Sequence, residues 1–124
     1  MAKLGNWFLR IATLYFMGGV VLGIVMAAQE EFTLRPVHAH VNLLGWVSLA
    51  LFGLYYRSVP AAAHTMLAKL HFWIYNVALP IQMGALAHFL QGNTAVVPVL
   101  GAASMAVAVA VLCFTVNVWR HTKD

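Results

Sequence analysis

The stretch Pro36–Pro60, PVHAHVNLLGWVSLALFGLYYRSVP, is long and apolar enough to cross a lipid bilayer, yet it begins with two histidines two residues apart. Ionisable side chains inside a membrane span are costly, and they commonly mark functional sites. Pro36 suits the first turn of a helix, and Thr33 is an acceptable N-terminal cap just upstream. His38 and His40 are therefore the first candidates for a functional site.

The spacing of these histidines predicts two sites rather than one. Positions i and i+2 of a helix point about 200° apart, so His38 and His40 should reach to opposite sides of the helix. Imidazole is a preferred ligand of iron, copper and zinc, and a histidine at membrane depth suits axial ligation of heme. The alternative is that both side chains lie at the water interface, solvated or bonded to loop carbonyls. Trp46 lies deeper in the same span, where it can pack on a ring.

The second span carries a spaced pattern of histidines, glycines and aromatic residues, namely His38-x-His40-x4-Gly45-Trp46-x6-Gly53-x2-Tyr56-x3-Pro60. This pattern resembles the tenth helix of the catalytic subunit (subunit I) of heme-copper oxidases. The likeness is closest to the C-family (cbb-type) enzymes and related nitric oxide reductases. The segment Leu70-His71-Phe72-Trp73 is similar to the H-F-W that opens the next helix of that family. The resemblance extends from Pro36 to about Ile74.

The resemblance implies a heme-binding protein. In that family the first histidine of the pair ligates the high-spin heme and the second ligates the low-spin heme. Carried over, this implies heme of the b type at His38 and His40, with copper as a further expected metal and an electron donor as a partner. The family's copper site needs a His-His pair, which this sequence lacks, and the first span, Trp7–Ala28, contains no histidine. One copy of the chain therefore does not encode the complete oxidase site, and the resemblance leaves enzyme activity open.

Composition independently predicts an all-α integral membrane protein. The chain has 124 residues, of which 63% are hydrophobic and only 8% are charged, whereas about 25% of residues are charged in soluble domains. We expect residues 1–124 to form a single four-helix transmembrane domain. Its apolar stretches of about 20 residues or more run over 7–28, 36–58, 66–90 and 94–119.

The distribution of charge predicts the topology. Basic residues cluster at both termini and around the second loop, whereas Glu30 and Glu31 lie in the first loop. By the positive-inside rule both termini face the cytoplasm of a bacterial-type inner membrane. Topology thus explains the net charge of +4, which gives no reason to invoke nucleic acid.

This topology places a third histidine at the depth of the pair. His38 and His40 lie near the outer face, and His88 lies near the outer end of the third span. His88 is therefore an additional candidate metal ligand, with simple interfacial placement as the alternative. His71 precedes His88 by 17 residues, about 25 Å along a helix, so it cannot share a site with the pair in the same chain.

Because one chain does not encode the complete site, several copies of the chain are expected to assemble into a homo-oligomer. The oxidase subunit has twelve helices in three pseudo-symmetric groups of four, so the resemblance implies a homotrimer whose neighbouring chains complete the heme pockets. A dimer is the alternative. Gly19-x3-Gly23 predicts a close helix contact, although these glycines could also reflect only the higher glycine content of membrane helices. We expect a bulky residue at Gly19 or Ala106 to loosen the oligomer.

Three function classes follow from the sequence. The favoured class is a heme-binding membrane protein acting in electron transfer or diatomic-gas binding. The second is heme or copper handling, or assembly of an oxidase, which the missing His-His pair favours. The third is a small oligomeric transporter or channel. Such transporters usually couple protons through an acidic residue within the membrane, and the predicted spans contain none.

Overall fold

The computed structural model describes residues 2–122, and every regular element in that range is helical. The predicted all-α class is confirmed. In chain order the elements are α1 (Ala2–Gln29), α2 (Arg35–His40), the π-helix η1 (Val41–Val47), α3 (Ser48–Ser58), α4 (Pro60–Ala63), α5 (Met66–Leu90), the 3₁₀ helix η2 (Thr94–Val96) and α6 (Val97–His121).

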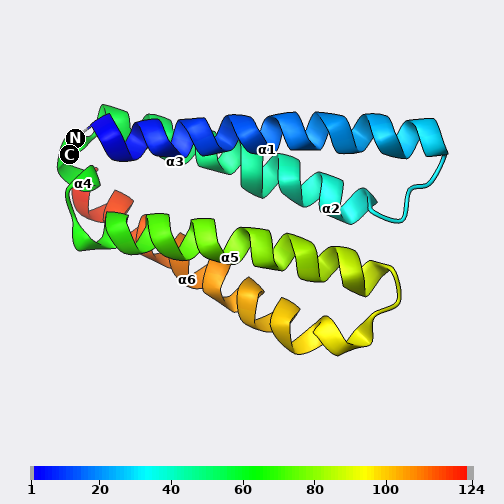
Figure 1. Ribbon diagram of the computed structural model, residues 1–124. Helices are drawn as coiled ribbons and strands as arrows, with labels where there is room; N and C mark the ends of the chain where they lie inside the picture. Colours follow the sequence, from blue (N-terminus) through cyan, green and yellow to red (C-terminus); the bar gives the residue numbers. More distant parts are fainter. Residues whose placement is uncertain (1, 123–124) are drawn as a thin grey trace.

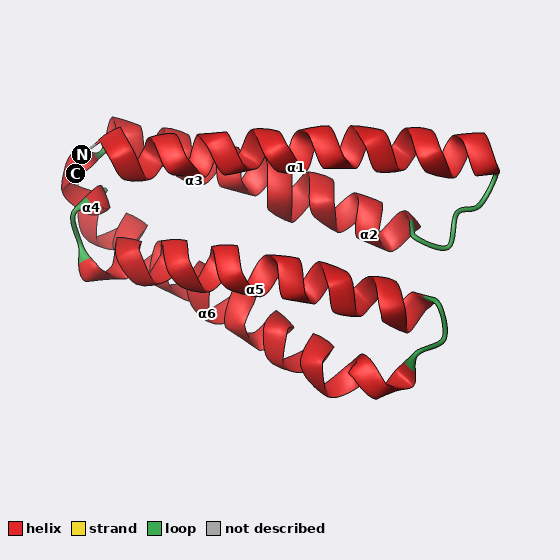
Figure 2. Cartoon of the chain, viewed as in Figure 1, coloured by secondary structure: helices red, strands yellow, loops and turns green. Residues whose placement is uncertain are grey.

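The helices form two hairpins that lie side by side (Figure 1). In one hairpin α1 packs against the continuous rod formed by α2, η1 and α3, and in the other α5 packs against α6. The short helix α4 connects the hairpins at the end where the chain begins and finishes, which we call the terminal end. The loops at 30–34 and 91–93 lie together at the other end, the hairpin end (Figure 2).

The predicted helix positions agree closely with the observed ones. The stretch 7–28 lies inside α1, the stretch 36–58 lies inside the α2–η1–α3 rod, and the stretch 66–90 coincides with α5. The stretch 94–119 corresponds to η2 followed by α6. Agreement is close because each apolar run is bounded by polar or turn-forming residues.

Three helical segments among residues 2–122 are long and apolar enough to cross a membrane: Lys3–Gln29, Arg35–Ser58 and Thr94–His121. The chain is therefore a multi-pass membrane protein. The helix α5 is not among them because polar residues such as Lys69, Asn76 and Gln82 lower its hydropathy. Large apolar side chains also cover the outside of the molecule, with Leu14 71% exposed. Lipid is the solvent that such a surface requires.

The largest buried side chains gather where the two hairpins meet. Phe8 of α1, Tyr56 of α3 and Tyr75 of α5 are fully buried there, together with Leu49 and Leu79. This contact between hairpins fixes α3 against α5, and it therefore sets the position of α2 and its histidines relative to the second hairpin.

Candidate functional site

The histidine pair lies in α2, at the hairpin end of the molecule. Pro36 occupies the first turn of this helix, as predicted, because the missing N–H of proline costs nothing there. The predicted cap is wrong: Leu34 is the N-cap residue and makes no side-chain capping bond. Thr33 instead donates from its hydroxyl and its backbone N–H to Glu31, and these bonds hold the pKa of the Glu31 carboxyl below its ordinary value.

His38 lies between α2 and α1. A Cβ atom placed on Gly23 of α1 would lie 3.0 Å from the His38 Nε2 atom, so the absence of a side chain at Gly23 makes room for this imidazole. The Asn42 amide, one turn further along, donates to His38 Nε2 at 3.2 Å and to the His38 carbonyl at 3.0 Å. The His38 ring is thus held against α1 by shape and by one hydrogen bond.

The predicted Gly19-x3-Gly23 contact is formed, but within one chain. Gly19 receives the Asn42 side chain and Gly23 receives the His38 ring, so an i, i+4 pair of glycines accommodates an i, i+4 pair of polar residues. A Cβ atom at Gly19 would collide with the Asn42 amide. The expectation that Gly19 lies at an oligomer contact is therefore wrong, because the neighbouring α2–η1 rod occupies its face.

His40 has a different environment. Its Nδ1 atom lies 2.7 Å from the Pro36 carbonyl oxygen, one turn earlier. A carbonyl oxygen only accepts, so the proton of this bond is on Nδ1, and Nε2 is the ring nitrogen that could bind a metal ion. A metal-ligating histidine is commonly oriented by such a bond from its other ring nitrogen. Since His38 faces α1, the spacing of two residues turns His40 away from that helix.

A π-helix follows His40 directly. It spans Val41–Val47, and the Ser48 hydroxyl donates to the Leu43 carbonyl at 2.6 Å, five residues back. The Tyr75 hydroxyl of α5 donates to the Leu44 carbonyl, also at 2.6 Å, and so attaches the second hairpin to this wider turn. Sequence reasoning did not find this element. π-helical turns are rare and are frequent at functional sites.

The ring of Trp46 stacks on the ring of Phe16 of α1, and its contact with a cofactor stays a prediction. The ring centroids are 4.4 Å apart and the planes are inclined by 11°. Phe16 therefore covers one face of the indole, and Trp46 also packs against the buried core.

The third candidate ligand, His88, lies exposed in the last turn of α5. It shares the hairpin end with His38 and His40, as predicted. Within residues 2–122, however, no three His, Cys, Asp or Glu side chains lie close enough to hold one metal ion. A three-imidazole copper site at this end would require more than one chain.

A further histidine is fully buried in the described core. His71 has no exposed surface, and its Nδ1 atom is hydrogen-bonded to the Tyr56 hydroxyl at 2.9 Å. The rings of Phe8, Phe52 and Phe114 surround it, with centroids 5.0, 4.4 and 5.0 Å away. Its Nε2 atom has no hydrogen-bond partner in the described chain.

Sequence reasoning separated His71 from the histidine pair correctly in depth, but it missed the bond to Tyr56. A signal was present, because Tyr56 closes one span and His71 lies in the first turns of the next. Residues on either side of a short connection between antiparallel helices are expected to meet.

Protein-family models, curated proteins and solved structures yield no match to this chain. The resemblance to the heme-copper oxidase subunit therefore rests on the motif residues themselves.

Proposed function

We propose that this chain is a heme-binding membrane protein in which the imidazole of His40 would hold the heme iron. The observation that carries the proposal is the hydrogen bond from His40 Nδ1 to the Pro36 carbonyl. It selects the tautomer and the ring orientation that metal-bound histidines use. The half-buried position of His40 beside a π-helix also supports its proposed role as a ligand.

His38 is proposed as the ligand of a second, separate heme site. In the conformation described here Asn42 holds its Nε2 atom. Ligation through Nε2 requires the Asn42 amide to give up that bond and keep its second bond, to the His38 carbonyl. We expect the His38 site to bind heme more weakly than the His40 site for this reason.

The remaining ligands are proposed to come from other copies of the chain. One chain supplies single imidazoles at the hairpin end, and these lie on different faces of α2. A homotrimer of four-helix units would bring such faces of neighbouring chains together, as the resemblance to a twelve-helix subunit implies. His88, exposed at the same end, is the residue that we propose as a ligand contributed across the interface.

The proposed membrane topology follows the charges. With both termini in the cytoplasm of a bacterial-type inner membrane, α5 crosses the bilayer beside the three more apolar segments. Its polar residues are then shielded by protein. The Gln82 amide donates to the Ser104 hydroxyl of α6 at 2.9 Å, which is the kind of bond that allows a polar residue inside a membrane.

Bound heme supplies electron transfer or binding of a diatomic gas, and the chain's own residues would orient it and exclude water. We do not propose proton-pumping oxidase turnover, because a copper site needs more imidazoles than the hairpin end of one chain offers. Where the iron is six-coordinate, carbon monoxide and nitric oxide should bind weakly.

The visible absorption spectrum of the purified protein, oxidised and reduced, tests the proposal. A Soret band is expected in protein produced with adequate heme. His38→Ala and His40→Ala should give different spectra, because the two imidazoles face different sites. Absence of a Soret band in the wild-type protein, or identical spectra and heme content in the two variants, would refute it.

A further inference from the structure

Two neighbouring cavities lie between α1 and α5 near the terminal end of the molecule. The outer cavity, of about 380 Å³, is lined by Lys3 and Lys69 among others. The inner cavity, of about 420 Å³, continues between the same helices past Ile11 and Val77. Both are lined by Trp7, Phe72 and Trp73. We infer that they form one path, with a basic mouth and an interior that is apolar apart from Asn76.

The mouth carries positive charge that the described chain does not balance locally. Lys3 and Lys69 come from different helices and both are exposed. The acidic residues of the described chain, Glu30 and Glu31, lie in the loop at the hairpin end, across the length of the molecule (Figure 1). Lysine ammonium groups are strongly hydrated point charges that bind phosphate. The mouth is therefore complementary to an anion.

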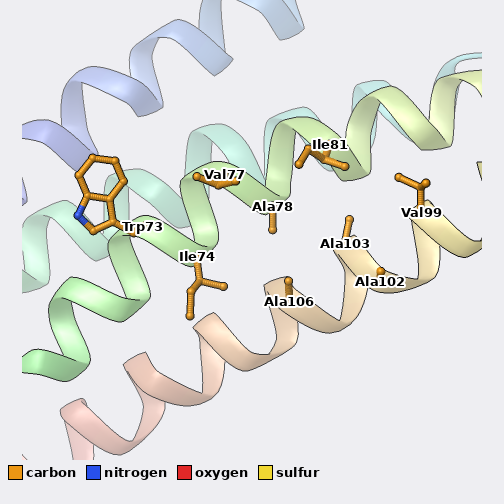
Figure 3. Close-up of a pocket in the computed structure, with 9 residues that line it drawn as sticks. All are labelled: Trp73, Ile74, Val77, Ala78, Ile81, Val99, Ala102, Ala103 and Ala106. Carbon is orange, nitrogen blue, oxygen red and sulfur yellow. The ribbon is translucent and has the colours of Figure 1, made fainter.

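The interior is complementary to hydrocarbon. A third cavity, a groove of about 580 Å³ between α5 and α6, shares Trp73 and Val77 with the inner cavity and is lined by small side chains such as Ala102 and Ala106 (Figure 3). Apolar grooves thus flank Trp73, whose side chain is 66% exposed. Trp7, 52% exposed, lies at the mouth. Tryptophans in such positions mark the level of lipid headgroups.

We propose that this path binds one anionic phospholipid. Its phosphate lies between Lys3 and Lys69, and its acyl chains lie in the apolar grooves on either side of Trp73. Basic pockets between helices on the cytoplasmic side of membrane proteins bind such headgroups. The site is at the opposite end of the molecule from the histidine pair, so this inference does not depend on heme.

Native mass spectrometry of the detergent-purified protein, titrated with dioleoyl phosphatidylglycerol, tests the proposal. Wild-type protein should bind one lipid in preference to dioleoyl phosphatidylcholine. The double variant Lys3→Gln/Lys69→Gln should bind phosphatidylglycerol roughly 30-fold more weakly, and each single variant roughly 5-fold more weakly. Arg120→Gln is the matched control. Arg120 is exposed in the last turn of α6 and does not line either cavity, so this substitution removes one positive charge outside the proposed site. It should leave binding unchanged.

Two further titrations separate the headgroup from the chains. Dihexanoyl phosphatidylglycerol should bind more weakly than the dioleoyl lipid, and inorganic phosphate should not displace the dioleoyl lipid. Equal weakening by Arg120→Gln and by the double variant would overturn the proposal, because it would show attraction to net charge alone. Equal binding of the short-chain lipid, or displacement by inorganic phosphate, would overturn the acyl-chain part of the site.

Discussion

The two ends of the molecule use histidine in opposite ways. At the terminal end His71 is fully buried, bonded to Tyr56 and enclosed by phenylalanine rings. At the hairpin end His40 is half-buried, and its Nδ1 atom is hydrogen-bonded to the Pro36 carbonyl of its own helix. Histidine thus packs in the core at the terminal end and is a candidate ligand at the hairpin end.

The difference lies in what surrounds the second ring nitrogen. His71 Nε2 is buried in the core and has no hydrogen-bond partner among the described residues. The helix α2 lies beside α1 and leaves His40 turned away from it. We therefore propose that burial of the ring, rather than the presence of histidine, distinguishes the structural role of His71 from the ligand role proposed for His40.

The largest expected effect on stability is at His71. His71→Ala removes a ring from the centre of the core and leaves the Tyr56 hydroxyl without its partner, which should destabilise the fold by about 2–4 kcal/mol. Unfolding of the purified protein in a denaturing detergent, followed by circular dichroism, measures this loss. His88→Ala is the control, because His88 is exposed, and its effect should lie within about 0.5 kcal/mol. Equal stability of the two variants would contradict the structural role of His71.

A smaller loss of stability is expected where α1 contacts His38. Gly23→Leu places a side chain where the His38 ring lies, so it should destabilise the fold by about 1–3 kcal/mol and move that ring. Gly18→Leu, five residues earlier on the same helix, meets open space and should be tolerated. Thermal unfolding of both variants makes the comparison. The packing of His38 on α1 would be refuted if Gly18→Leu proved the more damaging change.

The smallest expected loss of stability concerns the hydrogen bond that links the two hairpins. Tyr75→Phe deletes the hydroxyl that donates to the Leu44 carbonyl in the π-helix, at an expected cost of about 1 kcal/mol. The matched control is Tyr55→Phe, because the buried Tyr55 hydroxyl has no hydrogen-bond partner among the described residues. Its removal should be neutral or slightly stabilising. A larger loss from Tyr55→Phe than from Tyr75→Phe would contradict the proposed attachment of α5 to the π-helix.

The helices were predictable because hydropathy and turn residues determine where a membrane helix begins and ends. The stretch 66–90 was placed correctly as a helix even though its polar residues make it less hydrophobic than the others. The π-helix was not predictable in this way. The extra residue in the π-helical turn depends on which backbone carbonyls accept hydrogen bonds from other helices. The Leu44 carbonyl, for example, accepts from the Tyr75 hydroxyl.

The local geometry around the candidate site residues was predictable in part, whereas their ligand roles stay predictions. The spacing of His38 and His40 predicted different environments, and the structure gives them different hydrogen-bond partners. The partner of Gly19 was assigned wrongly, because a small-residue motif shows that a helix approaches closely but not whether that helix belongs to the same chain. The pairing of His71 with Tyr56 depends on the contact of two hairpins, which a linear pattern does not display.

The most direct test of the account is the heme content of His40→Ala, measured from the Soret band with and without added imidazole. We expect the variant to lose the low-spin heme spectrum while it keeps the wild-type far-ultraviolet circular dichroism. Free imidazole should restore that spectrum by taking the place of the deleted side chain. Full heme content and an unchanged spectrum in His40→Ala without imidazole would contradict the claim that His40 is the axial ligand.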